Sequence, residues 1–374
     1  MPTSVIPALG ALLAFALVSG CDDDGSSSAN GTPSGTGGVT GTGGSGIGTG
    51  GTPGTGGDVE PGGDGDGDGI GTGDGDGDGD GSEPVDAALL AKGWERVWAD
   101  EFDGDGIDEA RWQHAVDCWG GGNNEDQCYV DEDDNTFVAD GRLHLVALKD
   151  SPTGAVGGPD GDGNIVGKGH SSGKLTTQGM GDMLYGRIEV RARLPFGQGI
   201  WPAIWMMPTD SEYGGWARSG EIDIMEAINL KAAGAEPNRV HGTLHYGDGW
   251  PNNVHSGEHH DPPGDVTTEF HTYAVEWERG EIRWYVDDVH FATQNTWYSA
   301  GNAYPAPFDK RFYLILNLAV GGEWPGWPDD TTTFPQELVL EYVRVYRCAA
   351  DPTDGIGCGT VDPAVVPLAG NAGP

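Results

Sequence analysis

Basic residues are scarce in this chain of 374 residues. It contains 19 Lys and Arg against 59 Asp and Glu, which gives a formal net charge of −40. Nucleic acid and anionic lipid surfaces are themselves negative, so a chain this acidic is not expected to bind either of them through charge. The balance suits a neutral ligand better than a sulfated or uronic-acid polymer.

Long apolar runs are also lacking. The one near the start, Leu9 to Val18, is too short to span a membrane, and residues 1–21 carry no charged side chain. A short apolar segment of this kind is typical of a secretory signal. It ends in a Val-Ser-Gly-Cys run at Cys21 that resembles a bacterial lipobox, in which the cysteine is lipidated. We therefore expect a lipoprotein-type signal over 1–21 and a lipid anchor at Cys21, on the extracellular side or the bacterial cell surface. An ordinary, unlipidated cysteine is the alternative.

Cysteine is rare as well. Apart from Cys21 there are four, arranged as two pairs with nine residues between the members of each pair, Cys118 with Cys128 and Cys348 with Cys358. An even number of cysteines in an exported chain suggests disulfides. Pairing within each pair is the simplest arrangement, and the other two pairings stay open. No Cys-x-x-Cys spacing occurs, which argues against metal binding by these residues.

Aliphatic side chains are nearly missing from residues 22–85, which consist mainly of Gly, Asp, Ser and Thr. Residues 22–84 carry thirteen acids and no base. Such a segment cannot bury a core, so we predict a disordered linker. Its Asp-Gly repeats lack the ligand spacing of an EF-hand loop, which favours a solvated tether over a calcium site.

No segment shows a sustained helical period. From Trp94 to Arg347 the chain instead contains short alternating segments rich in β-forming residues, separated by Gly, Pro, Asn and Asp. This pattern predicts an all-β fold, a single antiparallel sandwich or barrel, over residues 86–348. Residues 349–374 form a tail of polar and small residues without a strand pattern.

Three carboxylates stand within six residues of one predicted buried strand: Glu221, Asp223 and Glu226. Acidic residues are depleted in strands and are seldom buried without partners. Alternation places Glu221 and Asp223 on one face, and Glu226 joins them only if a β-bulge adds one residue near Ile224 or Met225. Two carboxylates that face one cleft are the working groups of a glycosidase. We therefore predict a catalytic site, with three solvated acids on an edge strand as the alternative.

The run Glu221–Glu226 resembles the Glu-x-Asp-x-x-Glu signature of glycoside hydrolase family 16. Other segments are similar to that family in the same order: Val97–Phe102, Tyr185–Arg191, Trp201–Met206, His241–Tyr246, Asn317–Gly322 and Tyr342–Tyr346. The resemblance implies a jelly-roll β-sandwich of two antiparallel sheets with a concave substrate cleft. It also implies a retaining reaction with Glu221 as nucleophile, Glu226 as general acid/base and Asp223 assisting them.

Tryptophan is abundant, with 13 residues, and indole rings pack well on the C–H faces of sugars. The resemblance implies that Trp201 and Trp216 line the cleft. Trp205 shares the strand parity of Trp201, and a place in the cleft or in the core is equally expected for it. Trp324 stands in a loop, and we expect it to close one end of the groove.

Polar contacts to a sugar need fixed donors. Asn123 and Asn124 lie in the Gly-rich turn between Cys118 and Cys128 and resemble the family's Asn at a glycone subsite, although plain turn chemistry is the alternative. For His245, a place near the acid/base agrees with the family, and a buried, satisfied histidine is the alternative.

The resemblance implies no cofactor for catalysis and a structural calcium ion on the convex side, bound at Glu101, Gly141 and Glu341. We predict a monomeric, secreted or surface-anchored endo-β-1,3-glucanase that acts on laminarin-like polysaccharides. The extra residue in the signature distinguishes it from the shorter form of lichenases. The alternatives are an endo-1,3(4)-β-glucanase, an algal galactanase of the same family, or a non-catalytic glucan-binding module.

Overall fold

The structure is a computed structural model that describes residues 83–158 and 161–373. The predicted signal, Cys21 and nearly all of the predicted linker lie outside these residues. Within the described ranges, no helix has the length and apolar character needed to cross a membrane. The described part begins with helix α1 (Glu83–Ala91), which starts inside the predicted linker. Pro84 suits a first helical turn, and the Ala and Leu residues that follow favour a helix.

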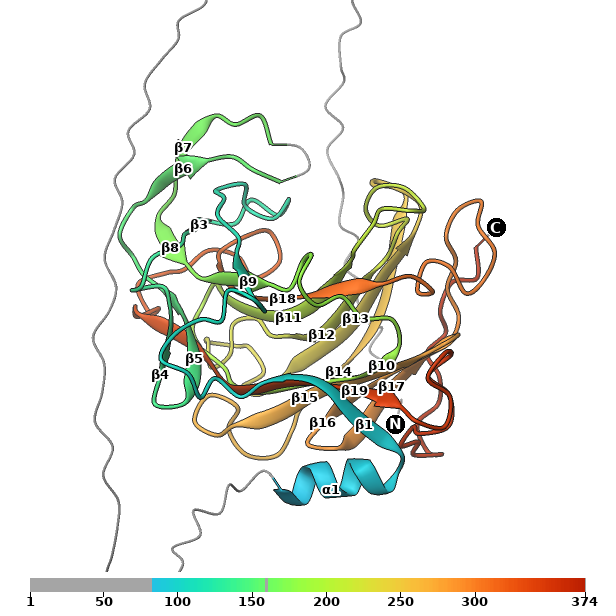
Figure 1. The fold of residues 1–374 in the computed structure, drawn as a ribbon. Helices are drawn as coiled ribbons and strands as arrows, with labels where there is room; N and C mark the ends of the chain where they lie inside the picture. Colours follow the sequence, from blue (N-terminus) through green and yellow to red (C-terminus); the bar gives the residue numbers. More distant parts are fainter. Residues whose placement is uncertain (1–82, 159–160, 374) are drawn as a thin grey trace, which may run out of the picture. The chain divides into compact units, whose positions relative to one another are not determined.

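Two antiparallel sheets make up the fold (Figure 1). The eight-stranded sheet runs in the order β17 (Val289–Gln294), β16 (Glu281–Val286), β15 (His271–Glu278), β10 (Gly186–Arg193), β19 (Gln336–Cys348), β5 (Arg142–Ala147) and β4 (Thr136–Ala139), and β1 (Trp94–Asp100) also pairs with β19. The seven-stranded sheet runs β14 (Asn253–His260), β13 (Val240–Gly247), β12 (Glu221–Glu226), β11 (Ile200–Pro208), β18 (Phe312–Val320), β9 (Lys174–Thr176) and β2 (Gln113–His114). Two small sheets pair β3 (Gln127–Tyr129) with β8 (His170–Ser172) and β6 (Thr153–Ala155) with β7 (Ile165–Gly167).

One main core fills the space between the two large sheets. Every second side chain of a strand points into it, for example Ile188 and Val190 of β10 and Leu314 and Leu316 of β18, all of them fully buried. Burial of each such side chain contributes about 1.5–3 kcal/mol. The antiparallel sandwich predicted from the alternating segments is therefore confirmed, and the other side of the seven-stranded sheet is left open for a site.

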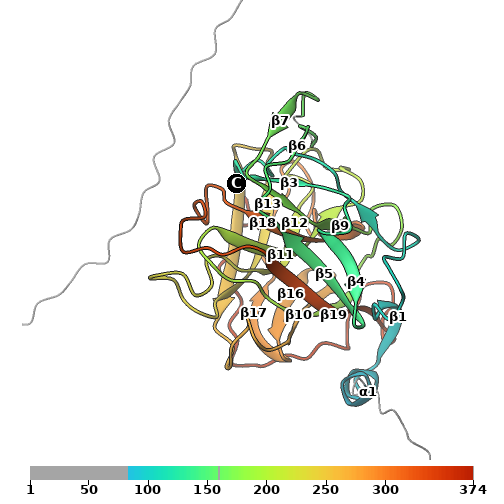
Figure 2. The same cartoon turned by 90° about the vertical axis from the view of Figure 1, so that its left-hand side faces the viewer.

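The two short-range disulfides are both present, Cys118–Cys128 and Cys348–Cys358. The second belongs to a small separate core that also contains Leu89 of α1. Figures 1 and 2 both place α1 beneath the eight-stranded sheet, on the side away from the seven-stranded sheet. The start of the described chain is thus fastened to the eight-stranded sheet through Trp94 and the Cys348–Cys358 disulfide.

The C-terminal tail has no strand, as predicted, but it packs closely on the eight-stranded sheet. The backbone N–H of Thr360 donates to Glu276 Oε2 at 2.9 Å, and the hydroxyl of Tyr285 donates to the carbonyl of Thr360 at 2.7 Å. Glu276 is fully buried and also pairs with Arg187 and Arg283. Since a buried charge needs partners, the tail completes the enclosure of an ion cluster.

The predicted calcium position contains Glu101, Gly141 and Glu341. The carboxylate of Glu101 accepts two hydrogen bonds from Arg344, at 2.8 and 2.7 Å. The carboxylate of Glu341 accepts from Arg142 at 2.9 Å and from Arg191 at 2.7 Å. Guanidinium groups already neutralise both carboxylates and would repel a calcium ion, so these residues as arranged do not fit the predicted metal site.

Candidate active site

The predicted β-bulge is present in β12. Against β11, Glu226 pairs with Ala203 and Asp223 with Trp205, and the pairing skips Ile224. The register against β13 shifts at the same place. One extra residue in β12 therefore returns Glu226 to the face of the sheet that carries Asp223, as the broken alternation predicted.

A buried indole from the other sheet holds the bulge in place. Trp284 of β16 donates from Nε1 to the carbonyl oxygen of Asp223 at 2.8 Å. Gly242, on the neighbouring strand β13, makes room for this ring, because a Cβ there would lie 2.4 Å from Trp284 Cδ1. The irregular backbone at the bulge thus keeps a hydrogen-bond partner although water is excluded, which a buried carbonyl requires.

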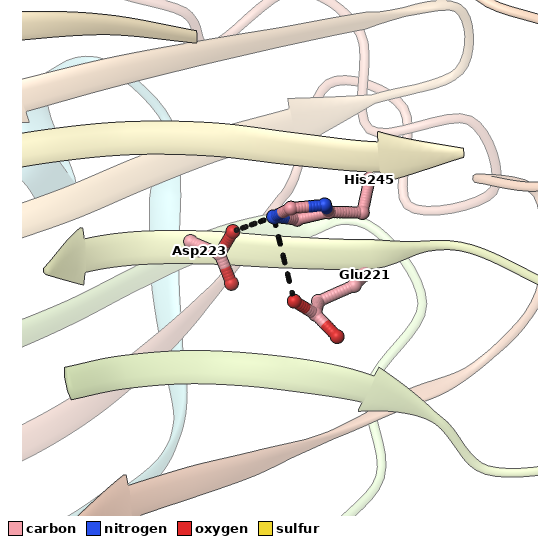
Figure 3. A group of neighbouring side chains, drawn as sticks. All are labelled: Glu221, Asp223 and His245. Atoms are coloured by element: carbon pink, nitrogen blue, oxygen red, sulfur yellow. Dashed lines mark ion pairs between the residues drawn. The ribbon is translucent and has the colours of Figure 1, made fainter. Parts of the chain in front are cut away.

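Three side chains surround the first acid, Glu221. The indole of Trp216 donates from Nε1 to Glu221 Oε2 at 2.7 Å. The imidazole Nε2 of His245 lies 3.7 Å from Glu221 Oε1 and 3.4 Å from Asp223 Oδ2, so one ring makes ion pairs with two carboxylates (Figure 3). The predicted positions of Trp216 and His245 beside the acids agree with this arrangement.

The second acid, Glu226, lies on the other side of Asp223 along the strand. Its Oε1 accepts a hydrogen bond of 3.0 Å from Nε1 of Trp201, the other tryptophan expected in the cleft. Each of the two glutamates is therefore fixed by one indole N–H, and Asp223, which is 2 % exposed, lies between them.

Burial and mutual repulsion raise the proton affinity of both glutamates. Burial, and then the charge of Asp223, raise the pKa of Glu221 to about 7, although His245 and the Trp216 N–H oppose the shift. Burial and the charge of Asp223 hold the pKa of Glu226 well above its usual range, and Glu221 adds to the effect. Glu226 therefore favours the protonated form, whereas His245 helps Glu221 to stay ionised.

His245 carries a proton in this setting. Burial lowers the pKa of its imidazole, but the charges of Glu221, Asp223 and Glu226 outweigh burial and raise the pKa to about 9. Among the described residues, the one group of side chains close enough to hold a metal ion is Glu221, Asp223 and His245, whose ligand atoms lie within 4.8 Å of one another. A protonated imidazole has no lone pair for a metal, so the group is better described as an ion-paired acid cluster.

Trp205 lies on the active face and not in the core. It is half-buried, and its Nε1 donates to Asn317 Oδ1 at 2.6 Å. Asn317 in turn donates to the hydroxyl of Tyr129 at 2.9 Å. The ammonium of Lys174 stands 5.5 Å from the ring of Trp205 and 5.1 Å from that of Tyr129. Beyond the parity of Trp205, no sequence pattern predicts this polar group, because its members come from four separate strands.

Trp324 packs beside Trp201, the tryptophan that donates to Glu226. Its ring meets Trp201 of β11 edge-on at 5.2 Å and His241 of β13 at 5.3 Å. Trp201 and His241 lie near the ends of their strands, and Glu226 is the last residue of β12. Trp324 therefore stands beside the end of the catalytic strand, and its closing of the groove stays a prediction.

The loop that contains Asn123 and Asn124 joins the loop of Trp324. Asn124 donates from Nδ2 to Glu323 Oε1 at 2.7 Å, and the Asn123 carbonyl accepts from the N–H of Glu323 at 2.9 Å. The Asn123 amide lies 3.5 Å from Glu125 Oε1. Asn124 therefore fixes the two loops to each other, whereas the side chain of Asn123 contacts its own turn.

Comparison with known proteins gives consistent matches. A family profile described as Glycosyl hydrolases family 16 matches residues 123–336. The glucan endo-1,3-beta-glucosidase A1 of Niallia circulans is 41% identical over 71% of this chain and 39% of its own length. The glucan endo-1,3-beta-glucosidase of Cryptopygus antarcticus is 41% identical over 64% of this chain and 85% of its own length. The solved laminarinase of Rhodothermus marinus is 39% identical, with a TM-score of 0.59 over 68% of this chain and 97% of that one.

The profile match includes the whole of β12 and the tryptophans that hold its two glutamates. The chain spans well under half of the Niallia protein and most of the other two, so the shared part is the sandwich itself. Its two antiparallel sheets are the jelly roll that the resemblance implied. The chain belongs to glycosyl hydrolase family 16.

Proposed function

We propose that the protein is a retaining endo-β-1,3-glucanase of the laminarinase type. The observation that carries this proposal is the bulged strand, which brings Glu226, whose pKa is raised by burial, and the ion-paired Glu221 to one face of the sheet. Two carboxyl groups that face one cleft are what a retaining glycosidase needs. The names of the two curated relatives, both glucan endo-1,3-beta-glucosidases, support β-1,3-glucan as the substrate.

The reaction follows from the protonation states. In the first step Glu226 gives its proton to the glycosidic oxygen while the Glu221 carboxylate attacks the anomeric carbon, so the glycosidic C–O bond breaks and a glycosyl-enzyme ester forms. In the second step Glu226, now a carboxylate, takes a proton from water. The water oxygen attacks the same carbon, the ester bond breaks, and the sugar leaves with its original configuration.

The neighbouring side chains keep the two glutamates in these roles. The indole of Trp216 and the charge of His245 stabilise Glu221 as an anion. The negative charge of Asp223 raises the pKa of Glu226 and so keeps its proton available. Asp223 also pairs with His245. We therefore assign the assisting role to Asp223 through charge, without direct contact with the reacting carbon.

Substrate binding in this proposal involves the tryptophans and amides already described. Trp201, Trp205 and Trp216 present indole rings for the C–H faces of glucosyl units, and Asn123 offers its amide to sugar hydroxyls. Lys174 joins this set, because its ammonium is half-buried between Trp205 and Tyr129. The substrate is a neutral polysaccharide in this proposal, in keeping with the acidic chain.

We further propose that the protein is a monomer that is secreted or held at the bacterial cell surface through a lipid on Cys21. Helix α1 lies on the side of the sandwich away from the active face. Mass spectrometry of the mature N-terminus tests the anchor, and an unmodified Cys21 or a cleavage after it would refute it.

The direct test is the release of reducing ends from laminarin by the natural protein, Glu221→Gln and Glu226→Gln. We expect the natural protein to be active and each variant to lose at least about 100-fold in rate, the usual worth of such a group. Rates close to the natural one in both variants would refute the assignment. Lichenan, agarose and carrageenan in parallel distinguish the mixed-linkage glucanase and galactanase alternatives. Tight laminarin binding by the natural protein without turnover would instead indicate a binding module.

A further inference from the structure

Half of the histidines of this chain lie on two neighbouring strands of the seven-stranded sheet. Five of the ten are on β13 and β14: His241, His245, His255, His259 and His260. The two strands run antiparallel, and their register sets His241 opposite His259 and His245 opposite His255. β14 is the edge strand of the sheet. The register thus brings together two pairs of a residue type that commonly binds metals.

Each pair has a ring separation that suits a shared metal ion. The ring centroids lie 6.2 Å apart in the pair His241–His259 and 5.5 Å apart in the pair His245–His255. Imidazole nitrogens bind zinc at about 2.0–2.1 Å, so two rings that share one ion have centres roughly 5–6.5 Å apart. Distance therefore admits both pairs, and the protonation of the rings decides between them.

The pair His245–His255 is not available to a metal. Nε2 of His245 lies 3.4 Å from Asp223 Oδ2 and 3.7 Å from Glu221 Oε1. Although burial lowers the pKa of His245, the charges of these acids and of Glu226 raise it to about 9, so the ring is protonated at neutral pH. A protonated imidazole has no lone pair to give to a metal. His255 therefore lacks a second metal ligand in this pair.

His241, in contrast, is uncharged at neutral pH. Burial, and then the charges of His259 and Arg239, lower the pKa of its imidazole to about 4. A neutral imidazole keeps a lone pair on one ring nitrogen. The guanidinium of Arg239 would repel a second cation, but it pairs with both carboxylate oxygens of Asp261, at 3.0 and 2.9 Å. The net charge of −40 also draws cations to the protein as a whole.

The ring of His259 is oriented by the carboxylate of Glu258. Nδ1 of His259 lies 2.9 Å from Glu258 Oε1, and the backbone N–H of His259 donates to the same oxygen at 2.9 Å. A carboxylate that accepts from one ring nitrogen fixes the hydrogen there and raises the metal affinity of the other nitrogen, here Nε2. The side chain of His259 is 47% exposed, so an ion from the solvent can reach it.

We propose that His241 and His259 bind one divalent transition-metal ion, such as Zn²⁺, Ni²⁺ or Cu²⁺, and that the ion clasps the edge strand β14 to β13. Imidazole nitrogens favour these metals, whereas Ca²⁺ and Mg²⁺ prefer oxygen ligands. Water fills the remaining coordination positions. Because the two ligands meet only in the folded sheet, binding stabilises the folded protein. The site is independent of the proposed function, which assigns neither residue a role.

The test is a calorimetric titration of NiCl₂ into the untagged full chain at neutral pH, after EDTA and gel filtration have removed bound metal. Two variants remove one ligand each, His241→Gln and His259→Gln. Two matched controls, His255→Gln and His260→Gln, remove a neighbouring histidine of β14 instead. His255 belongs to the pair that is not available to a metal, and His260 follows His259 but stacks on Phe291 at 5.3 Å.

We expect the natural protein and both controls to bind one Ni²⁺ with the same affinity. A further variant, Glu258→Gln, should lose about tenfold in affinity, the usual cost of removing the hydrogen-bond partner of a ligand. His241→Gln and His259→Gln should each lose more than that. The second readout is the melting temperature. An excess of Ni²⁺ should raise it in the natural protein and both controls and leave it unchanged in the two ligand variants.

Three results would overturn the proposal. The first is a natural protein that binds no Ni²⁺, or binding of natural strength in both ligand variants. The second is an equal loss in His255→Gln, which would place the ion at the other pair. The third is an equal loss in His260→Gln, which would show that affinity follows the packing of the strands instead of these two ligands. Laminarin cleavage enters none of these readouts, so failure of the proposed function leaves this test unaffected.

Discussion

His245 determines the charge balance of the catalytic centre, and its replacement by glutamine gives a prediction with a definite sign. Glutamine keeps a polar side chain of similar reach but carries no charge. In His245→Gln the anion of Glu221 loses its cationic partner while the charge of Asp223 remains. The pKa of Glu221, already about 7, therefore rises further. The acidic limb of the pH profile of kcat/KM, which reports the ionisation of the nucleophile, should move to higher pH.

The size of the shift follows from the geometry. His245 Nε2 lies 3.7 Å from Glu221 Oε1, and two unit charges about 4 Å apart attract each other by about 4 kcal/mol at an effective dielectric constant near 20. The two side chains are 23% and 14% exposed, so water takes up part of this energy. A retained effect of about 1.4–2.7 kcal/mol corresponds to an upward shift of about one to two pH units.

The assay is kcat/KM on laminarin from acidic to alkaline pH for the natural protein, His245→Gln and His241→Gln. His241 serves as the control because its pKa is about 4, so it is already neutral above that pH. Its replacement should leave the acidic limb in place. An acidic limb that stays in place in His245→Gln, or that moves equally in both variants, would refute the electrostatic role given to His245.

Three further outcomes are expected. Because folding raises the pKa of Glu226, ionisation of this residue lowers the stability of the folded protein once the pH exceeds the pKa of the unfolded chain. Glu226→Gln cannot ionise, so its free energy of unfolding should exceed that of the natural protein by more than about 1.4 kcal/mol at alkaline pH and should match it at strongly acidic pH. A lower melting temperature of the variant at alkaline pH would contradict this. Replacement of Cys118 and Cys128 by serine should lower the free energy of unfolding by about 2–3 kcal/mol and raise KM. The same change at Cys348 and Cys358 should lower stability alone, and an equal rise of KM in both variants would count against a binding role for the loop between Cys118 and Cys128. Removal of calcium with EDTA should leave the melting temperature unchanged, since arginines pair the carboxylates at the predicted calcium position; a drop that calcium reverses would refute that pairing.

The bulge and the sandwich could be predicted from the sequence because both depend on local alternation. Three acids in one apolar strand are visible in the residues themselves, and the failure of Glu226 to alternate points to a single extra residue. The two disulfides and the indoles beside the acids could also be predicted, because the spacing of the cysteines and the family resemblance indicated them. Each of these features depends on residues close together in the chain or on a known motif.

Other parts of the site depend on contacts between distant segments. Trp284 supports the bulge from the opposite sheet, 61 positions along the chain from Asp223. Lys174, Asn317 and Tyr129 meet around Trp205 only because β9, β18 and β3 come together. A polar tail without strand pattern gives no sign that Thr360 will bind Glu276. The pairing of neighbouring strands, and not local periodicity, creates these contacts.

The histidines of β13 and β14 show how strand register adds to what the sequence indicates. The sequence shows several histidines between His241 and His260, but alternation alone leaves their partners unknown. Only the pairing of β13 with β14 shows that His241 lies opposite His259 and His245 opposite His255.

The assignment of the two glutamates is the central claim, and azide rescue of Glu221→Ala and Glu226→Ala on an aryl laminarioligoside tests it most directly. In Glu221→Ala, azide takes the place of the missing carboxylate and attacks the anomeric carbon of the bound substrate, so the product should be the α-glycosyl azide. In the second variant azide should attack the glycosyl-enzyme ester, so the product should be the β-glycosyl azide. Nuclear magnetic resonance of the products distinguishes the two. The opposite pair of configurations, or α-azide from both variants, would contradict the roles given to Glu221 and Glu226.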